Sequence, residues 1–158
     1  MNPRQPWRRI GAVAAGFLSV AVLSLGTDEV LHLLKVYPPW GPMYAPGLNA
    51  LALSYRLIYG VLGGYITARL APFAPMHHAG ILGIVAFVLS AIAAAGTIPM
   101  HLGPAWYPIA LALIALPTAG AGGVLYAKQN RREPLTLTAL THQFLFSYAS
   151  RLPGGDDF

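Results

Sequence analysis

Four long apolar segments, separated by short stretches rich in proline and glycine, make up most of the chain. They cover residues 10–36, 48–70, 79–100 and 106–127. A helix needs ~20 apolar residues to cross a hydrocarbon layer of ~30 Å, and each segment is long enough. The last two contain no Asp, Glu, Lys or Arg. The pattern predicts an all-α membrane protein whose residues 1–127 form an antiparallel four-helix transmembrane bundle.

The pattern changes after Lys128. Polar residues come first, and then Leu137, Leu140, Phe144 and Tyr148 recur three or four positions apart, which places them on one face of a helix. Residues 128–158 are therefore predicted to be a short cytoplasmic segment, with an amphipathic helix at 134–150 lying on the membrane surface. A poorly ordered tail is the alternative.

The start of the chain resembles a secretory signal, because Arg4, Arg8 and Arg9 precede an apolar run. The apolar character resumes at Val30, however, and three more segments follow. We therefore expect an uncleaved first span.

Composition agrees with a membrane protein. Of the 158 residues, 56% are hydrophobic and 9% are charged, against about 25% charged in an ordinary soluble domain. The net charge of +5 is spread over short segments beside the apolar runs, so a nucleic-acid partner is not expected and the lipid bilayer is. Without cysteine the chain has no disulfide, thiolate ligand or thiol nucleophile.

The basic residues predict an orientation. With four spans, eight Lys and Arg residues fall on one side and Lys35 alone on the other, apart from Arg56 within a span. Positive charge is retained on the cytoplasmic side. We expect a multi-pass protein of the bacterial inner membrane with both termini cytoplasmic. The eight are Arg4, Arg8, Arg9, Arg69, Lys128, Arg131, Arg132 and Arg151.

Small residues recur every four positions in each segment. Lipid provides no hydrophobic drive between helices, so association depends on close backbone approach and dispersion. The stripes predict a tight bundle, and the same faces could serve a homo- or hetero-oligomer. The stripes are Gly11, Ala15 and Ser19; Gly60, Gly64 and Ala68; Ala79 and Gly83; and Ala115, Ala119 and Gly123.

The candidate chemistry lies in the charges within the apolar segments. A charge at mid-bilayer costs at least about 2.5–3.5 kcal/mol, so such residues pair or serve a function. Asp28 and Arg56 have similar expected depths in adjacent segments, and we expect an ion pair between them, with Glu29 as a second partner. Ser24, Asp28, His32 and Lys35 share one helical face. The candidate polar cluster or ligand site comprises Asp28, Glu29, His32, Tyr55, Arg56 and Tyr59.

Other chemistry receives little support. Glu29 and His32 have the i, i+3 spacing of a di-iron site, but residues 48–127 supply no further carboxylate. His32 and His101 lack a supporting motif for haem or metal, and no phosphate-binding loop or nucleophile elbow is present. We expect no cofactor, no metal and no catalytic residue.

Four segments resemble short, uncharacterised bacterial integral membrane proteins with four predicted spans. They are residues 22–28 (VLSLGTD), 36–40 (VYPPW), 63–72 (GGYITARLAP) and 103–108 (GPAWYP). The resemblance extends over about residues 8 to 127 and implies a fold without implying a function.

Three functions are compatible with these patterns. The leading expectation is a non-enzymatic structural or accessory component that acts through helix packing. The alternative is a minimal transporter or a proton- or ion-linked component that uses the Asp28–Arg56 cluster. A membrane enzyme ranks third. A cavity reaching Asp28 would favour transport, and a dry, satisfied ion pair would favour the accessory function.

Overall fold

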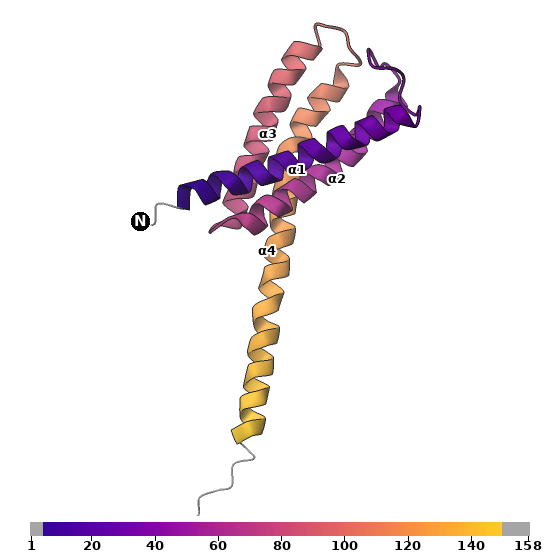
Figure 1. Ribbon diagram of the computed structural model, residues 1–158. Helices are drawn as coiled ribbons and strands as arrows, with labels where there is room; N and C mark the ends of the chain where they lie inside the picture. Colours follow the sequence, from indigo (N-terminus) through magenta and orange to yellow (C-terminus); the bar gives the residue numbers. More distant parts are fainter. Residues whose placement is uncertain (1–4, 150–158) are drawn as a thin grey trace, which may run out of the picture. The chain divides into compact units, whose positions relative to one another are not determined.

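The computed structural model describes the backbone of residues 5–149, and the side chains of residues 6–130 and 141–147. The chain divides into two compact units, Met1–Ala127 and Lys128–Phe158. Within residues 5–149 the secondary structure is entirely helical, without strands: α1 Gln5–Leu33, α2 Pro46–Leu70, α3 Pro75–Thr97 and α4 Trp106–Ala149 (Figure 1).

Three helices are long and apolar enough to cross a membrane: Pro6–Leu33, Pro75–Thr97 and Trp106–Asn130. These properties are those of a multi-pass membrane protein. The helix α2 is long but less apolar, because it carries Asn49, Tyr55, Arg56 and Tyr59. Three of the four segments expected from the sequence are therefore both long and apolar enough to cross a membrane.

Helix boundaries follow local backbone chemistry. Pro46 and Pro75 occupy the first turns of α2 and α3, where the missing amide hydrogen costs nothing. The first helix ends at Leu33, three residues before the predicted end, because Lys35 adopts a left-handed φ of 58°. Lys35 therefore lies outside the helical face that was expected to include it.

The third helix starts four residues earlier than predicted. His77 and His78 thus belong to the first turn of α3, and His78 is only 2% exposed. Its Nδ1 lies 3.2 Å from the Ala74 carbonyl oxygen. The fourth helix continues past residue 127 to Ala149, where a break and a separate helix at 134–150 were expected; residue 150 lies outside the described backbone.

The core of the first unit is built mainly from small side chains, with Tyr37, Tyr55 and Leu82 as its larger members, while most large apolar side chains face outward. Leu18, Val22, Ile92 and Leu113 are each more than half exposed. This inversion of the usual soluble pattern suits a lipid surround, where close backbone approach holds helices together. The buried alanines are Ala12, Ala52, Ala68, Ala79, Ala94, Ala112 and Ala119.

Close helix contacts occur at glycine. On α2, a Cβ at Gly64 would collide with the backbone of Ala119, and one at Gly122 of α4 with the backbone around Val61. On α1 the buried small residues are Ala12, Gly16 and Ser24, whereas Gly11 has open space around it. The Gly11 stripe predicted from the sequence therefore lies one position off the packed face.

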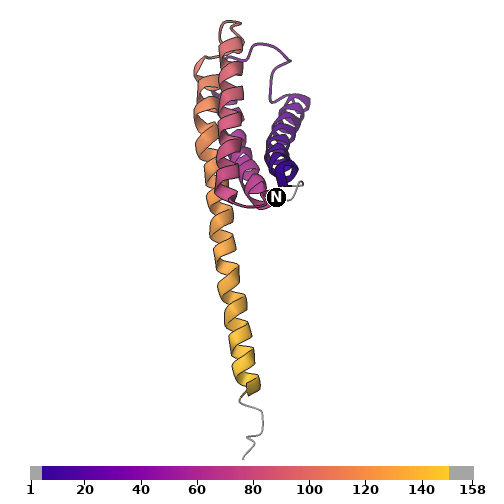
Figure 2. The ribbon, with the colours of Figure 1, turned by 90° about the vertical axis from the view of Figure 1, so that its left-hand side faces the viewer.

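Each helix of the first unit contacts more than one other: α1 and α2 both contact α3, and α2 also contacts α4. Figures 1 and 2 show α1 beside α2, and α3 beside the part of α4 that belongs to the first unit. Contacts between α1 and α2 join Gly16 to Thr67 and Thr27 to Tyr59, so residue numbers rise on one helix as they fall on the other. The same holds between α3 and α4, where Gly83 meets Leu116 and Ala79 meets Gly123.

Two loops meet at one end of this unit. The Met43 amide donates to the Leu102 carbonyl at 2.9 Å, and the Tyr44 hydroxyl donates to the His101 carbonyl. Asn49 donates to the Met43 and Ala45 carbonyls, both at 3.0 Å. We call this the loop end of the bundle; the opposite end holds the start of α1 and the turn between α2 and α3.

Candidate functional site

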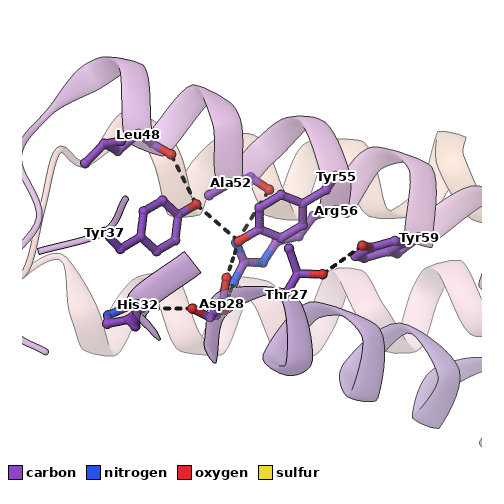
Figure 3. Close-up of polar contacts among 9 residues, drawn as sticks. All are labelled: Thr27, Asp28, His32, Tyr37, Leu48, Ala52, Tyr55, Arg56 and Tyr59. Atoms are coloured by element: carbon purple, nitrogen blue, oxygen red, sulfur yellow. Dashed lines mark hydrogen bonds and ion pairs between the residues drawn. The ribbon is translucent and has the colours of Figure 1, made fainter. Parts of the chain in front are cut away.

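The charged residues Asp28 and Arg56 form the ion pair expected from the sequence. Arg56 Nη2 on α2 donates to Asp28 Oδ2 on α1 at 2.5 Å (Figure 3). The side chains are 22% and 14% exposed, so both are largely withdrawn from the surroundings. A charge in this position is tolerated because its partner neutralises it, and removal of either partner would leave the other uncompensated.

The hydroxyl of Tyr55 completes the pair. It donates to Asp28 Oδ1 and accepts a hydrogen bond of 3.0 Å from Arg56 Nη1. Both carboxylate oxygens are thereby satisfied. Because Tyr55 and Arg56 are consecutive on α2, their common approach to Asp28 requires the tyrosine ring to turn toward the arginine, as Figure 3 shows.

A second tyrosine reaches this group from the loop end. Tyr37 is 5% exposed, and its hydroxyl lies 3.3 Å from that of Tyr55 and 3.5 Å from the Leu48 carbonyl oxygen. Tyr37, Ala52 and Tyr55 form a buried cluster. The chain after α1 therefore returns to the bundle and covers the ion pair.

Aromatic rings also surround the guanidinium group. The Arg56 Cζ atom lies 5.1 Å from the Tyr55 ring centre and 6.0 Å from that of Tyr107 on α4. A cation near the face of such a ring is attracted by the ring quadrupole. Arg56 thus links α1, α2 and the start of α4.

The other predicted site residues take different places. His32 Nδ1 lies 2.9 Å from the Asp28 carbonyl oxygen, and its ring stacks on Trp40 with centres 4.0 Å apart. The Tyr59 hydroxyl bonds to Thr27 Oγ1 at 2.8 Å, one turn from the ion pair. Glu29 is exposed, and its side chain makes no ion pair with another described residue. Glu29 is therefore not the second partner of Arg56 that the sequence suggested.

Two cavities meet at Arg56. One, of about 190 Å³, lies at the loop end and is lined by Asp28, His32, Tyr37, Trp40 and Arg56, among others. We call it the polar cavity. The other, of about 310 Å³, lies among all four helices; its lining is mostly apolar and includes Arg56 but not Asp28. We call it the apolar cavity.

Polar groups in the apolar cavity are few and separated. Ser24 of α1, Ser90 of α3 and Thr118 of α4 line it together with Gly60. The Thr118 hydroxyl donates to the Ile114 carbonyl at 2.7 Å, which satisfies it within its own helix. Arg56 is therefore the charged group that this cavity offers.

The described residues contain no group of three or more His, Asp or Glu side chains placed to hold a metal ion. Sequence reasoning did not include Tyr37 and Tyr107 in the candidate site, although the structure places both beside Arg56 or Tyr55. The sequence does place Tyr and Trp residues among prolines in the segments that follow residue 36 and precede residue 108. That signal does not distinguish a ring at the headgroup layer from one turned inward.

Comparison of the chain with known protein families, curated proteins and solved structures gives no match. Function must be argued from the site itself.

Proposed function

We propose that this chain is a bacterial inner-membrane protein with four antiparallel spans and both termini in the cytoplasm. The opposed registers of α1 with α2, and of α3 with α4, support the antiparallel order. As the second span, α2 has 25 residues and a length of about 37 Å. Its pairing of Arg56 with Asp28 reduces the cost of the charge it would carry into the bilayer.

Within this topology, we propose that the protein is a minimal proton- or ion-linked transport component. The observation that carries the proposal is that Arg56 lines both the polar and the apolar cavity. A purely structural ion pair would be enclosed by packed side chains on every side. Here Arg56 lines both spaces, and Asp28 also lines the polar cavity.

The proposed mechanism uses the two ionisable partners in turn. A proton that enters through the polar cavity binds Asp28 and cancels the charge that holds Arg56. The guanidinium group is then free to move toward the apolar cavity, and the two spaces join. Loss of the proton restores the pair. Tyr55, which contacts both partners, positions them and keeps the separation short.

A proton-flux measurement tests this proposal. Purified protein is reconstituted into liposomes that contain a pH-sensitive dye, and a pH gradient is imposed. We expect faster dissipation than in protein-free liposomes, and a return to the protein-free rate with Asp28→Asn. The matched control is Glu29→Gln, which removes the adjacent but exposed carboxylate and should keep the flux. Equal rates for the wild type and Asp28→Asn would reject the proton-linked function.

The second candidate is the structural or accessory component. It is favoured by the complete pairing of Asp28, whose two carboxylate oxygens are both occupied. In that function the ion pair fixes the register of α1 against α2, and the exposed apolar helix faces meet lipid or a partner protein. Absence of flux together with loss of stability in Asp28→Asn is the result this function expects.

A further inference from the structure

A separate groove lies at the end of the bundle opposite the loop end. It has a volume of about 470 Å³ and is bordered by α1, α3 and the turn between α2 and α3. Its walls are apolar side chains, including Val13 and Phe17 of α1 and Ile81 and Val85 of α3. Arg9, Phe73 and His77 stand at its edge. We call it the basic-edged groove.

The lining residues of α1 extend over a length comparable with that of an acyl chain in one leaflet. From Arg9 to Phe17 the first helix rises about 12 Å, and a single leaflet of the hydrocarbon layer is about 15 Å thick. Ile10 and Phe73 on its rim are 61% and 41% exposed, so the groove opens toward the surroundings of the helices. For helices that cross a membrane, those surroundings are lipid.

The charge at its edge is not balanced within the described residues. The Arg9 guanidinium carbon lies 4.2 Å from the centre of the Phe73 ring, which fixes its position without neutralising it. The acidic side chains that the structure describes are Asp28 and Glu29, which lie 19 and 20 residues further along α1, at least about 28 Å away. His77 is exposed and lines the same groove as Arg9, where its ring adds a hydrogen-bond donor.

A backbone turn and a ring contact hold the edge of the groove in place. Ala74 adopts a left-handed φ of 43°, and the His77 amide donates to its carbonyl at 3.0 Å, which starts α3 directly beneath Phe73. The buried His78 ring meets the Phe73 ring edge-on, with centres 5.5 Å apart. Phe73 is thereby held as a platform for Arg9.

We propose that the basic-edged groove binds an anionic phospholipid, with an acyl chain along Val13, Phe17 and Ile81 and the phosphate at Arg9 and His77. An arginine held flat by an aromatic ring still presents its N–H edge, which matches phosphate oxygens in a bidentate manner. Basic pockets between transmembrane helices are suited to such headgroups. The site is independent of the Asp28–Arg56 cluster and of the transport proposed for it.

Native mass spectrometry of the detergent-solubilised full chain tests the proposal. The protein is titrated with phosphatidylglycerol and with phosphatidylcholine of identical acyl chains. We expect preferential retention of phosphatidylglycerol, and loss of that preference in Arg9→Gln. The matched control is Arg8→Gln, which removes the same charge from the preceding residue, one that does not line the groove. Equal preference in the two variants overturns the proposal.

Two further experiments distinguish the contribution of the lipid's acyl chain from that of its headgroup. Ile81→Trp fills the groove but keeps Arg9 and His77, so it should weaken phosphatidylglycerol binding. Thermal stabilisation by phosphatidylglycerol should not be reproduced by glycerol phosphate, which has the charge without the chain. If glycerol phosphate stabilises equally well, the site takes free phosphate and the lipid assignment is wrong. If Arg9→Gln fails to fold, phosphatidylglycerol binding is measured instead in Arg9→Lys, which preserves the charge.

Discussion

At the scale of single residues, the centre of the molecule is a carboxylate and a guanidinium group that satisfy each other. Asp28 receives one hydrogen bond from Arg56 and one from Tyr55, and no described side chain competes for it. A buried pair of this kind contributes little compared with an apolar substitute, but breaking it on one side costs much more. The contribution of the ion pair to stability is therefore measured by the coupling energy between Asp28 and Arg56 rather than by the effect of removing one of them.

A double-mutant cycle should reveal that coupling. Asp28→Asn and Arg56→Gln each leave one charge unpaired, and we expect each to lower the free energy of unfolding by about 2 kcal/mol, since the partly exposed site reduces the full buried-pair penalty. The double variant should cost less than the sum of the two. Stability is followed by thermal or denaturant unfolding in detergent micelles. Additive effects would contradict the pair, and Glu29→Gln should change stability little.

At the scale of the helices, packing is decided by which small residues face inward. Gly122 of α4 lies against the backbone of α2, whereas Gly120, two positions earlier on the same helix, has no heavy atom near its missing side chain. Two glycines only two positions apart thus have opposite roles. The position of each glycine on the helix, rather than its residue type, determines how much stability an added methyl group would cost.

Substitution by alanine should separate these roles. Gly122→Ala forces a methyl group into the backbone of α2, and we expect a loss of about 1–3 kcal/mol from overpacking. Gly120→Ala places it in open space and should be neutral or stabilising by up to about 1 kcal/mol, because alanine favours the helix. The two variants are compared by thermal unfolding in the same detergent. A larger loss for Gly120→Ala would mean that the packed face of α4 is assigned wrongly.

The sequence predicted the helical segments and the Asp28–Arg56 pair, because apolar length and the cost of a lone charge in lipid are local properties. It did not predict that α1 would end at Leu33, since the left-handed turn at Lys35 depends on how the following loop is held. It misplaced the packed face of α1 by one position, because Gly11 and Ala12 are both small enough for close helix packing. It could not place Tyr37 beside Tyr55, since that contact depends on the path of a loop of several prolines.

At the scale of the whole molecule, the distribution of charge is expected to set the orientation in the membrane. The basic residues gather at one side of the proposed spans, and the loop end carries Lys35 as its basic residue. The same asymmetry leaves the basic edge formed by Arg9 and His77 next to one leaflet. Orientation and lipid contact would thus have a common electrostatic origin.

A reporter fused after Phe158 tests the orientation. With both termini in the cytoplasm, alkaline phosphatase at this position should be inactive, because it requires export, and a fluorescent protein that folds in the cytoplasm should be bright. Fusions at Tyr44, in the proposed outer loop, should give the reverse result. A strong phosphatase signal at the C-terminus would overturn the topology.

The hydrogen bond between Met43 and Leu102 has a mechanical consequence. It joins the loop of the α1–α2 hairpin to the loop of the α3–α4 hairpin through a single amide, and the Tyr44 hydroxyl adds a second hydrogen bond beside it. Any rocking of one hairpin away from the other at this end must first break these two bonds. The two hydrogen bonds therefore restrain separation of the hairpins at the loop end, where Met43 also lines the polar cavity.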